Sequence, residues 1–69
     1  MTKKKKEFIT REQKDRFNYI CTHNNITMNQ AALILLISPW LLQALLNGSI
    51  AITKQEKEMF IKKGFDLWN

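Results

Sequence analysis

Residues 27–49 read TMNQAALILLISPWLLQALLNGS, and this stretch contains two helix starts separated by only one helix length. Thr27 and Gln30 fit a capping box, in which the Thr hydroxyl accepts from the N3 amide and the Gln side chain accepts from the cap amide. Ser38 followed by Pro39 fits a hydroxyl N-cap with proline at the first helical position, where its missing N–H costs nothing. Helices over residues 27–36 and 38–46 therefore leave room only for a sharp turn between them.

The same signals occur on both sides of this pair. Two further capping boxes, Thr10-Arg-Glu-Gln13 and Thr53-Lys-Gln-Glu56, predict helices over residues 10–23 and 53–63. Asn47-Gly48 and Gly64 follow predicted helices, where glycine easily adopts the left-handed C-cap conformation. Only two Gly and one Pro argue against a turn-rich β architecture. We therefore expect an all-α fold, a compact domain of four helices.

Length and composition limit how this domain can be stabilised. A chain of 69 residues is near the lower limit for folding without a disulfide or a metal, and its one Cys and one His supply neither. We expect a flexible basic arm in residues 1–9 and a single domain in residues 10–69, with a short apolar tail docked on the core. Helical spacing assigns further residues to that core: Phe17, Ile20, Cys21 and Phe60.

Charge is distributed unevenly along the chain. All eleven Lys and Arg and all six Asp and Glu lie in residues 3–16 and 54–66, and none lies between Phe17 and Thr53. The net charge of +5 and the pI near 9.7 suit a polyanionic partner. Much of the excess comes from the run of Lys in residues 3–6, and such runs are usually solvated tails. The two central helices therefore bring no cation of their own to a phosphate.

Residues 28–47 resemble the helix-turn-helix of the phage repressor and Cro family. In that family's motif the fourth, fifth, eighth, tenth, fifteenth and eighteenth residues are buried, and here all six are apolar: Ala31, Ala32, Leu35, Ile37, Leu42 and Leu45. The small Ala32 matters because the second helix of the motif crosses close to it. The Ile37-Ser38 start and the Asn47-Gly48 end of that helix also match the family pattern. The resemblance covers residues 10–63 and implies a lambda-repressor-like domain that regulates transcription.

Two departures from the family pattern bear on function. The ninth motif residue, usually Gly in the turn, is Leu36, so the turn must be made without a residue that enters positive φ easily. Positions outside the buried set, generally polar in the family, are large and apolar. These surplus residues are Leu33, Ile34, Leu36, Trp40, Leu41 and Leu46. They either enlarge the core or form a partner interface, because exposed apolar patches that contain a Trp are typical of binding sites.

The resemblance implies operator DNA as the first partner. The residues that could contact it are Thr27, Ser38, Trp40, Gln43, Asn47, Lys54, Lys3, Lys4, Lys5 and Lys6. Gln43 can pair bidentately with adenine, whereas the predicted recognition helix offers no Arg or Lys to guanine. We expect a Cro-like repressor that binds double-stranded DNA, with a homodimer reading two half-sites. The alternative is a modulator or antirepressor that uses its apolar surface to bind a cognate repressor protein instead of DNA.

Other classes of function find little support. Asp and Glu are few and lie among Lys, and no nucleophile with a base or phosphate-binding Gly loop is present. We therefore expect no enzyme, no small-molecule substrate, no cofactor and no metal. Residues 26–46 are uncharged and about as long as a membrane span, but a central Ser-Pro and three side-chain amides interrupt them. We expect no membrane partner and a location in the cytoplasm of a bacterial host cell.

Overall fold

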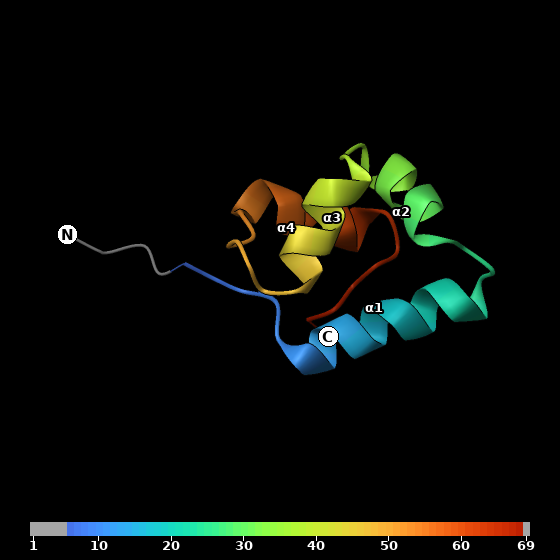
Figure 1. Ribbon diagram of the computed structural model, residues 1–69, viewed down its shortest axis with the longest axis horizontal. Helices are drawn as coiled ribbons and strands as arrows, with labels where there is room; N and C mark the ends of the chain where they lie inside the picture. The colour runs from blue at the N-terminus through green and yellow to red at the C-terminus, as the bar shows by residue number, and fades with distance from the viewer. Residues whose placement is uncertain (1–5, 69) are drawn as a thin grey trace.

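The computed structural model describes residues 6–68 and contains four helices: α1 (Arg11–His23), α2 (Met28–Leu35), α3 (Pro39–Leu46) and α4 (Lys54–Lys62). In Figure 1, α1 lies along one side of the molecule, and α2, α3 and α4 gather above it. Within the described residues the extended backbone pairs only at one isolated antiparallel bridge, between Glu7 and Ile52. The expected all-α class with four helices is confirmed.

Each helix begins at the hydroxyl residue that the sequence marks. The capping boxes at Thr10, Thr27 and Thr53 are all present, with both reciprocal hydrogen bonds formed. At the start of α3 the Ser38 hydroxyl accepts from the Leu41 N–H at 3.0 Å, and Pro39 occupies the first turn. These bonds satisfy amides that have no partner inside the helix, so the four starts are determined locally.

All four helices also end in the same way, with one residue in the left-handed region: Asn25 (φ 56°), Leu36 (φ 62°), Gly48 (φ 74°) and Gly64 (φ 98°). In each case the next N–H donates to the carbonyl five residues earlier, as a Schellman motif requires. The four bonds are Ile26 to Cys21 at 2.8 Å, Ile37 to Ala32 at 3.0 Å, Ser49 to Ala44 at 3.0 Å and Phe65 to Phe60 at 2.8 Å. Only at Leu36 is the left-handed residue neither Gly nor Asn.

The core is built around the aromatic ring of Phe17 on α1. Its ring centroid lies 4.8 Å from that of Phe65 in the tail and 5.9 Å from that of Phe60 on α4. The tail therefore docks as expected, and the predicted core residues Ala31, Ala32, Leu35, Leu42, Leu45 and Cys21 are buried with these rings. The predictions for Ile20 and Ile37 were too strong, because both side chains are only partly buried at the edge of the core.

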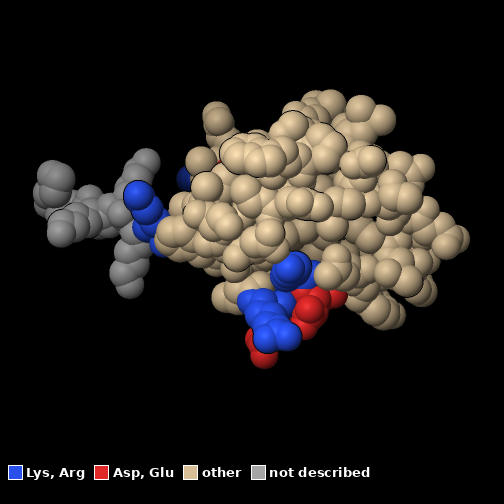
Figure 2. Space-filling model, viewed as in Figure 1, with Lys and Arg blue, Asp and Glu red and all other residues tan. Residues whose placement is uncertain are grey.

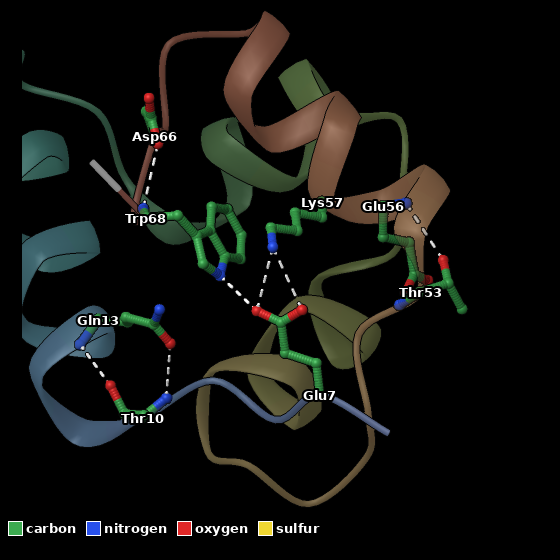
Figure 3. A network of polar contacts seen from close by, with 8 residues as sticks. All are labelled: Glu7, Thr10, Gln13, Thr53, Glu56, Lys57, Asp66 and Trp68. Atoms are coloured by element: carbon green, nitrogen blue, oxygen red, sulfur yellow. Dashed lines mark hydrogen bonds and ion pairs between the residues drawn. The ribbon is translucent and has the colours of Figure 1, made fainter. Parts of the chain in front are cut away.

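The segment before α1 belongs to the domain, which corrects part of the expected flexible arm over residues 1–9. Ile9 is buried, and the Glu7 carbonyl accepts from the Ile52 N–H at 2.8 Å. The Glu7 carboxylate pairs with Lys57 Nζ at 3.3 Å and accepts from the Trp68 indole Nε1 at 2.8 Å (Figure 3). One side chain thus ties together the segment before α1, α4 and the tail.

The angle between α2 and α3 is 100°, across a break of three residues. This is the geometry of a helix-turn-helix, and it follows from the left-handed Leu36 and the new cap at Ser38. Among the described helices, none is long and apolar enough to cross a membrane by itself. The α2–α3 pair has the length and composition together, but the 100° bend divides it.

Candidate interaction surface

Four large apolar side chains project from α2, the turn and the start of α3. The exposed fractions are 74% for Leu33, Leu36 and Trp40 and 37% for Ile34. We call this set of four residues the apolar ridge. Exposing a Trp and two Leu to this extent leaves apolar area in water that burial would stabilise, at about 25 cal/mol per Å². The ridge is therefore a surface suited to being covered.

Two of the six surplus residues do not belong to the ridge. Leu46 is buried at 2% exposure, so its assignment as an interface residue was wrong. It lies one helical turn from Leu42 on the core side of α3, where the docked Ile9 lines the same hollow. Leu41 is half-buried and packs against the core, which makes it at most an edge residue. The protein's own core thus buries Leu46 fully and Leu41 in part.

A groove runs beside the ridge, between the turn and α4. It has a volume of about 180 Å³ and is lined by Leu35, Leu36, Ile37, Gln55, Glu56, Met59 and Phe60. The carboxylate of Glu56 is occupied by the capping box, where it accepts from the Thr53 N–H at 2.9 Å (Figure 3). The lining is otherwise mostly apolar, so the groove suits an apolar side chain better than a polar ligand.

The surface over α2 and α3 is uncharged. Figure 2 shows it as a continuous neutral area, whereas charged side chains lie at the lower edge of that view, where Figure 1 places α1, and at the left beside the grey residues. No Asp, Glu, Lys or Arg occurs between Phe17 and Thr53. Polyanion binding draws on cations close to the phosphates. This face therefore offers shape and apolar area but no positive charge.

The DNA-contact candidates fall into four groups. The hydroxyls of Thr27 and Ser38 cap helices and are engaged by backbone amides at 3.1 Å and 3.0 Å. Asn47 Oδ1 accepts from Lys14 Nζ at 2.8 Å, which holds this side chain toward α1. Gln43, Trp40, Lys54 and Lys6 are exposed. Lys3, Lys4 and Lys5 lie outside the described residues, so the structure bears only on the last residue of that run.

Three features of this surface were not predicted from the sequence. The groove needs α4 as its second wall, and no local pattern in residues 54–62 indicates which helix α4 will face. The contact of Lys14 with Asn47 joins residues 33 positions apart. The left-handed conformation of Leu36 could have been inferred from its place in the family motif, where glycine is usual, but the residue type argues against it.

The one Cys is a core residue rather than a reactive group. The Cys21 side chain is buried, and desolvation raises the pKa of its thiol above the ordinary value. A raised pKa keeps the thiol protonated and a poor nucleophile. In residues 6–68 no group of three His, Cys, Asp or Glu side chains gathers closely enough to hold a metal ion.

Comparison of the chain with protein-family models, with curated proteins and with solved structures finds no match in any of the three. The resemblance to phage repressors therefore rests on the residues of the sequence motif alone. The chemistry of the surface itself is an uncharged face, an exposed Trp and Leu ridge, and an apolar groove beside it.

Proposed function

We propose that this protein is a small phage-type transcription regulator that acts by binding a cognate repressor protein through its helix-turn-helix surface. The observation that carries this proposal is the apolar ridge, with Trp40, Leu33 and Leu36 each 74% exposed. Exposed Trp side chains are enriched at binding hot spots, and the ridge adds exposed aliphatic area on the same pair of helices. In this role the protein would act in the cytoplasm of a bacterial host cell, as a modulator of repression.

The charge distribution supports a protein partner over DNA at this face. A DNA-reading helix approaches within hydrogen-bond distance of phosphates, and most of the affinity there comes from neutralising them. α3 carries one exposed polar side chain in its interior, Gln43, and no cation. A complex with an apolar partner surface would be stabilised by these residues, because burying Trp and Leu against apolar atoms removes their area from water.

Direct DNA binding, as a Cro-like repressor, is the second candidate. It is favoured by the 100° angle between α2 and α3, by the exposed Gln43 amide and by Lys54 at the start of α4. Gln43 would then read adenine, and Lys54 and Lys6 would contact phosphates. This arrangement predicts that Lys54→Ala weakens binding to all sequences and flattens the salt dependence, while Gln43→Ala changes the sequence preference.

Two parallel binding titrations distinguish the two candidate functions. The labelled protein is titrated with a candidate cognate repressor and, in parallel, with the operator DNA of that repressor. We expect repressor binding that Trp40→Ala weakens by about 30-fold or more, whereas Gln43→Ala and Lys54→Ala leave it unchanged. Tyr19→Ala is the matched control, because Tyr19 is an exposed aromatic residue on α1 rather than on α2 or α3. DNA binding at low salt without repressor binding would reject the first candidate.

A further inference from the structure

The groove beside the ridge has two chemically different walls. One wall is the end of α2 and the turn, where Leu35, Leu36 and Ile37 line the groove and the chain has no charged residue. The other wall is α4, with Met59 among its lining residues. A segment that fills this groove therefore contacts apolar atoms on one side and a helix rich in charged residues on the other.

The charges of α4 are mainly positive and lie partly at the end of the groove. Residues 54–63 contain four Lys and two Glu, an excess of two positive charges. Lys62 and Lys63 are exposed and form no ion pair within residues 6–68. They follow Met59 by three and four positions, so they lie one helical turn beyond it on the same side of the helix. Two cations without an anionic partner thus lie beside the groove.

The one carboxylate in the groove lining lies toward the other end of α4. Glu56 comes three residues before Met59, and its carboxylate accepts from the Thr53 N–H at 2.9 Å (Figure 3). Along α4 the charge beside the groove therefore changes from one anion near the helix start to two cations at the helix end. A partner that presents its anions at the end near Lys62 and Lys63 is electrostatically complementary to this order.

Leu36, on the opposite wall, indicates that the groove is covered in a complex. Its backbone is left-handed (φ 62°), a conformation that the other three helix ends give to Asn25, Gly48 and Gly64. The Leu36 side chain gains little from the protein's own core, because it is 74% exposed. A strained apolar residue that lines a groove and stays in solvent points to a contact outside the isolated molecule.

An amphipathic helix combines the apolar and acidic groups that this groove accommodates. Asp and Glu are favoured in the first turn of a helix by its macrodipole, and an apolar residue three or four positions later lies on the same face. A helix antiparallel to α4 would bring its first turn to Lys62 and Lys63 and that apolar residue to the groove. The groove volume of about 180 Å³ is sufficient for one large side chain, since an apolar cavity of about 150 Å³ takes a benzene molecule.

We propose that the groove binds an amphipathic helix of the partner protein, antiparallel to α4, with an acidic first turn beside Lys62 and Lys63 and a large apolar side chain against Met59 and Leu36. This inference rests on the proposed function, because it names the segment of the partner protein that the groove recognises. The apolar side chain supplies contact area, while the acidic turn fixes the direction of the helix in the groove.

Selection from a displayed peptide library on the purified full chain tests the proposal. The library is an alanine-rich helix with random residues in its first turn and at one position a turn later. We expect peptides enriched on the wild type to carry Asp or Glu in the first turn and Leu, Met or Phe at the later position. On the Lys62→Glu/Lys63→Glu chain the first turn should change to Lys or Arg. Lys54→Glu is the matched control, since it reverses an exposed charge at the other end of α4, and its peptides should stay acidic.

The same first-turn composition on all three chains, or no enriched peptide at all, would overturn the proposal. A synthetic peptide of the enriched sequence then locates the site. Its dissociation constant should rise by about 10-fold or more in the double Lys→Glu chain and by a smaller factor in Lys62→Gln/Lys63→Gln, and added salt should also raise it. Thermal melts show that both double variants are folded.

The methyl resonance of Met59 should shift when the peptide binds. That of Met28, seven residues before the groove residue Leu35, should stay in place. An unshifted Met59, or equal affinity for a neutral peptide, would contradict the proposal and favour a neutral apolar partner or a second copy of this chain. These measurements contain no repressor, so they can succeed where repressor binding fails. Repressor binding that the double Lys→Glu chain retains in full would reject this inference and leave the proposed function intact.

Discussion

At the scale of single residues, position in the helix rather than hydrophobicity decides what is buried. Leu42, Leu45 and Leu46 point into the core from one side of α3, while Trp40 is 74% exposed on the same helix. All four are large and apolar, so composition alone could not separate them. The family pattern identified Leu42 and Leu45 correctly. It missed Leu46, because the side chain that lies beside it, Ile9, comes from a segment outside the motif.

We expect Leu42→Ala to destabilise the domain by about 2–5 kcal/mol, because it removes a fully buried side chain and leaves a cavity. Leu33→Ala, on the exposed ridge, should change the free energy of unfolding by less than about 0.5 kcal/mol. Urea denaturation followed by circular dichroism measures both. Equal losses in the two variants would mean that the ridge is part of the core.

The Cys21 thiol gives a pH dependence with a defined sign. Desolvation raises its pKa in the folded state, so the unfolded chain loses this proton first as the pH rises. Its contribution to stability is therefore complete below the unfolded value of about 9.0 and declines above it, toward the folded pKa. In urea melts between pH 7 and pH 10.5, the wild type should lose more stability above pH 9 than Cys21→Ala does. Parallel pH profiles would contradict this.

At the scale of helices, both ends of every element are set by local chemistry. The starts at Thr10, Thr27, Ser38 and Thr53 were predicted from short sequence patterns, because a hydroxyl N-cap acts within three residues. The ends at Gly48 and Gly64 were equally clear. The end at Leu36 could not be predicted in this way, because Leu disfavours the left-handed conformation that the turn imposes. The turn is there because Ser38 and Pro39 begin a new helix and Ile37 bonds back to Ala32.

Thr27→Ala should cost about 1 kcal/mol of stability, because it removes the hydroxyl that accepts from the Gln30 N–H at 3.1 Å. Thr22→Ala is the control, since Thr22 is an exposed residue near the end of α1 that caps no helix start. Thermal melts of the two variants should differ by about 4–8 °C. Identical melting temperatures would show that this capping box contributes no stability.

At the scale of the whole molecule, contacts between distant parts of the chain complete the domain. Glu7 and Trp68 are 61 positions apart, and their hydrogen bond joins the two ends of the described chain beside α4 (Figure 3). The ring of Trp68 in turn packs edge-on to Phe60 and beneath Lys57. The apolar tail could be predicted to dock from its composition. Its hydrogen bond to Glu7 could not, because nothing local relates the two positions.

Glu7→Gln should cost less than about 1 kcal/mol, because the pair with Lys57 is partly exposed and such ion pairs are weak. The amide oxygen of Gln can still accept from the Trp68 indole. Glu7→Ala removes this bond as well and should cost more, about 1–2 kcal/mol. The indole N–H resonance of Trp68 should move in Glu7→Ala and stay near its place in Glu7→Gln. A Glu7→Ala domain as stable as the wild type would contradict the tie between the two ends.

We propose that the α2–α3 face binds a protein partner rather than DNA. Trp40 reports on this directly in a Trp68→Phe chain, where it is the only Trp. Because the Trp40 side chain is 74% exposed, its fluorescence in a dilute sample should resemble that of a solvated indole. Titration with the cognate repressor should shift the emission to shorter wavelength and protect Trp40 from acrylamide quenching, while operator DNA should leave both unchanged. Protection by DNA, with no response to the repressor, would contradict the claim.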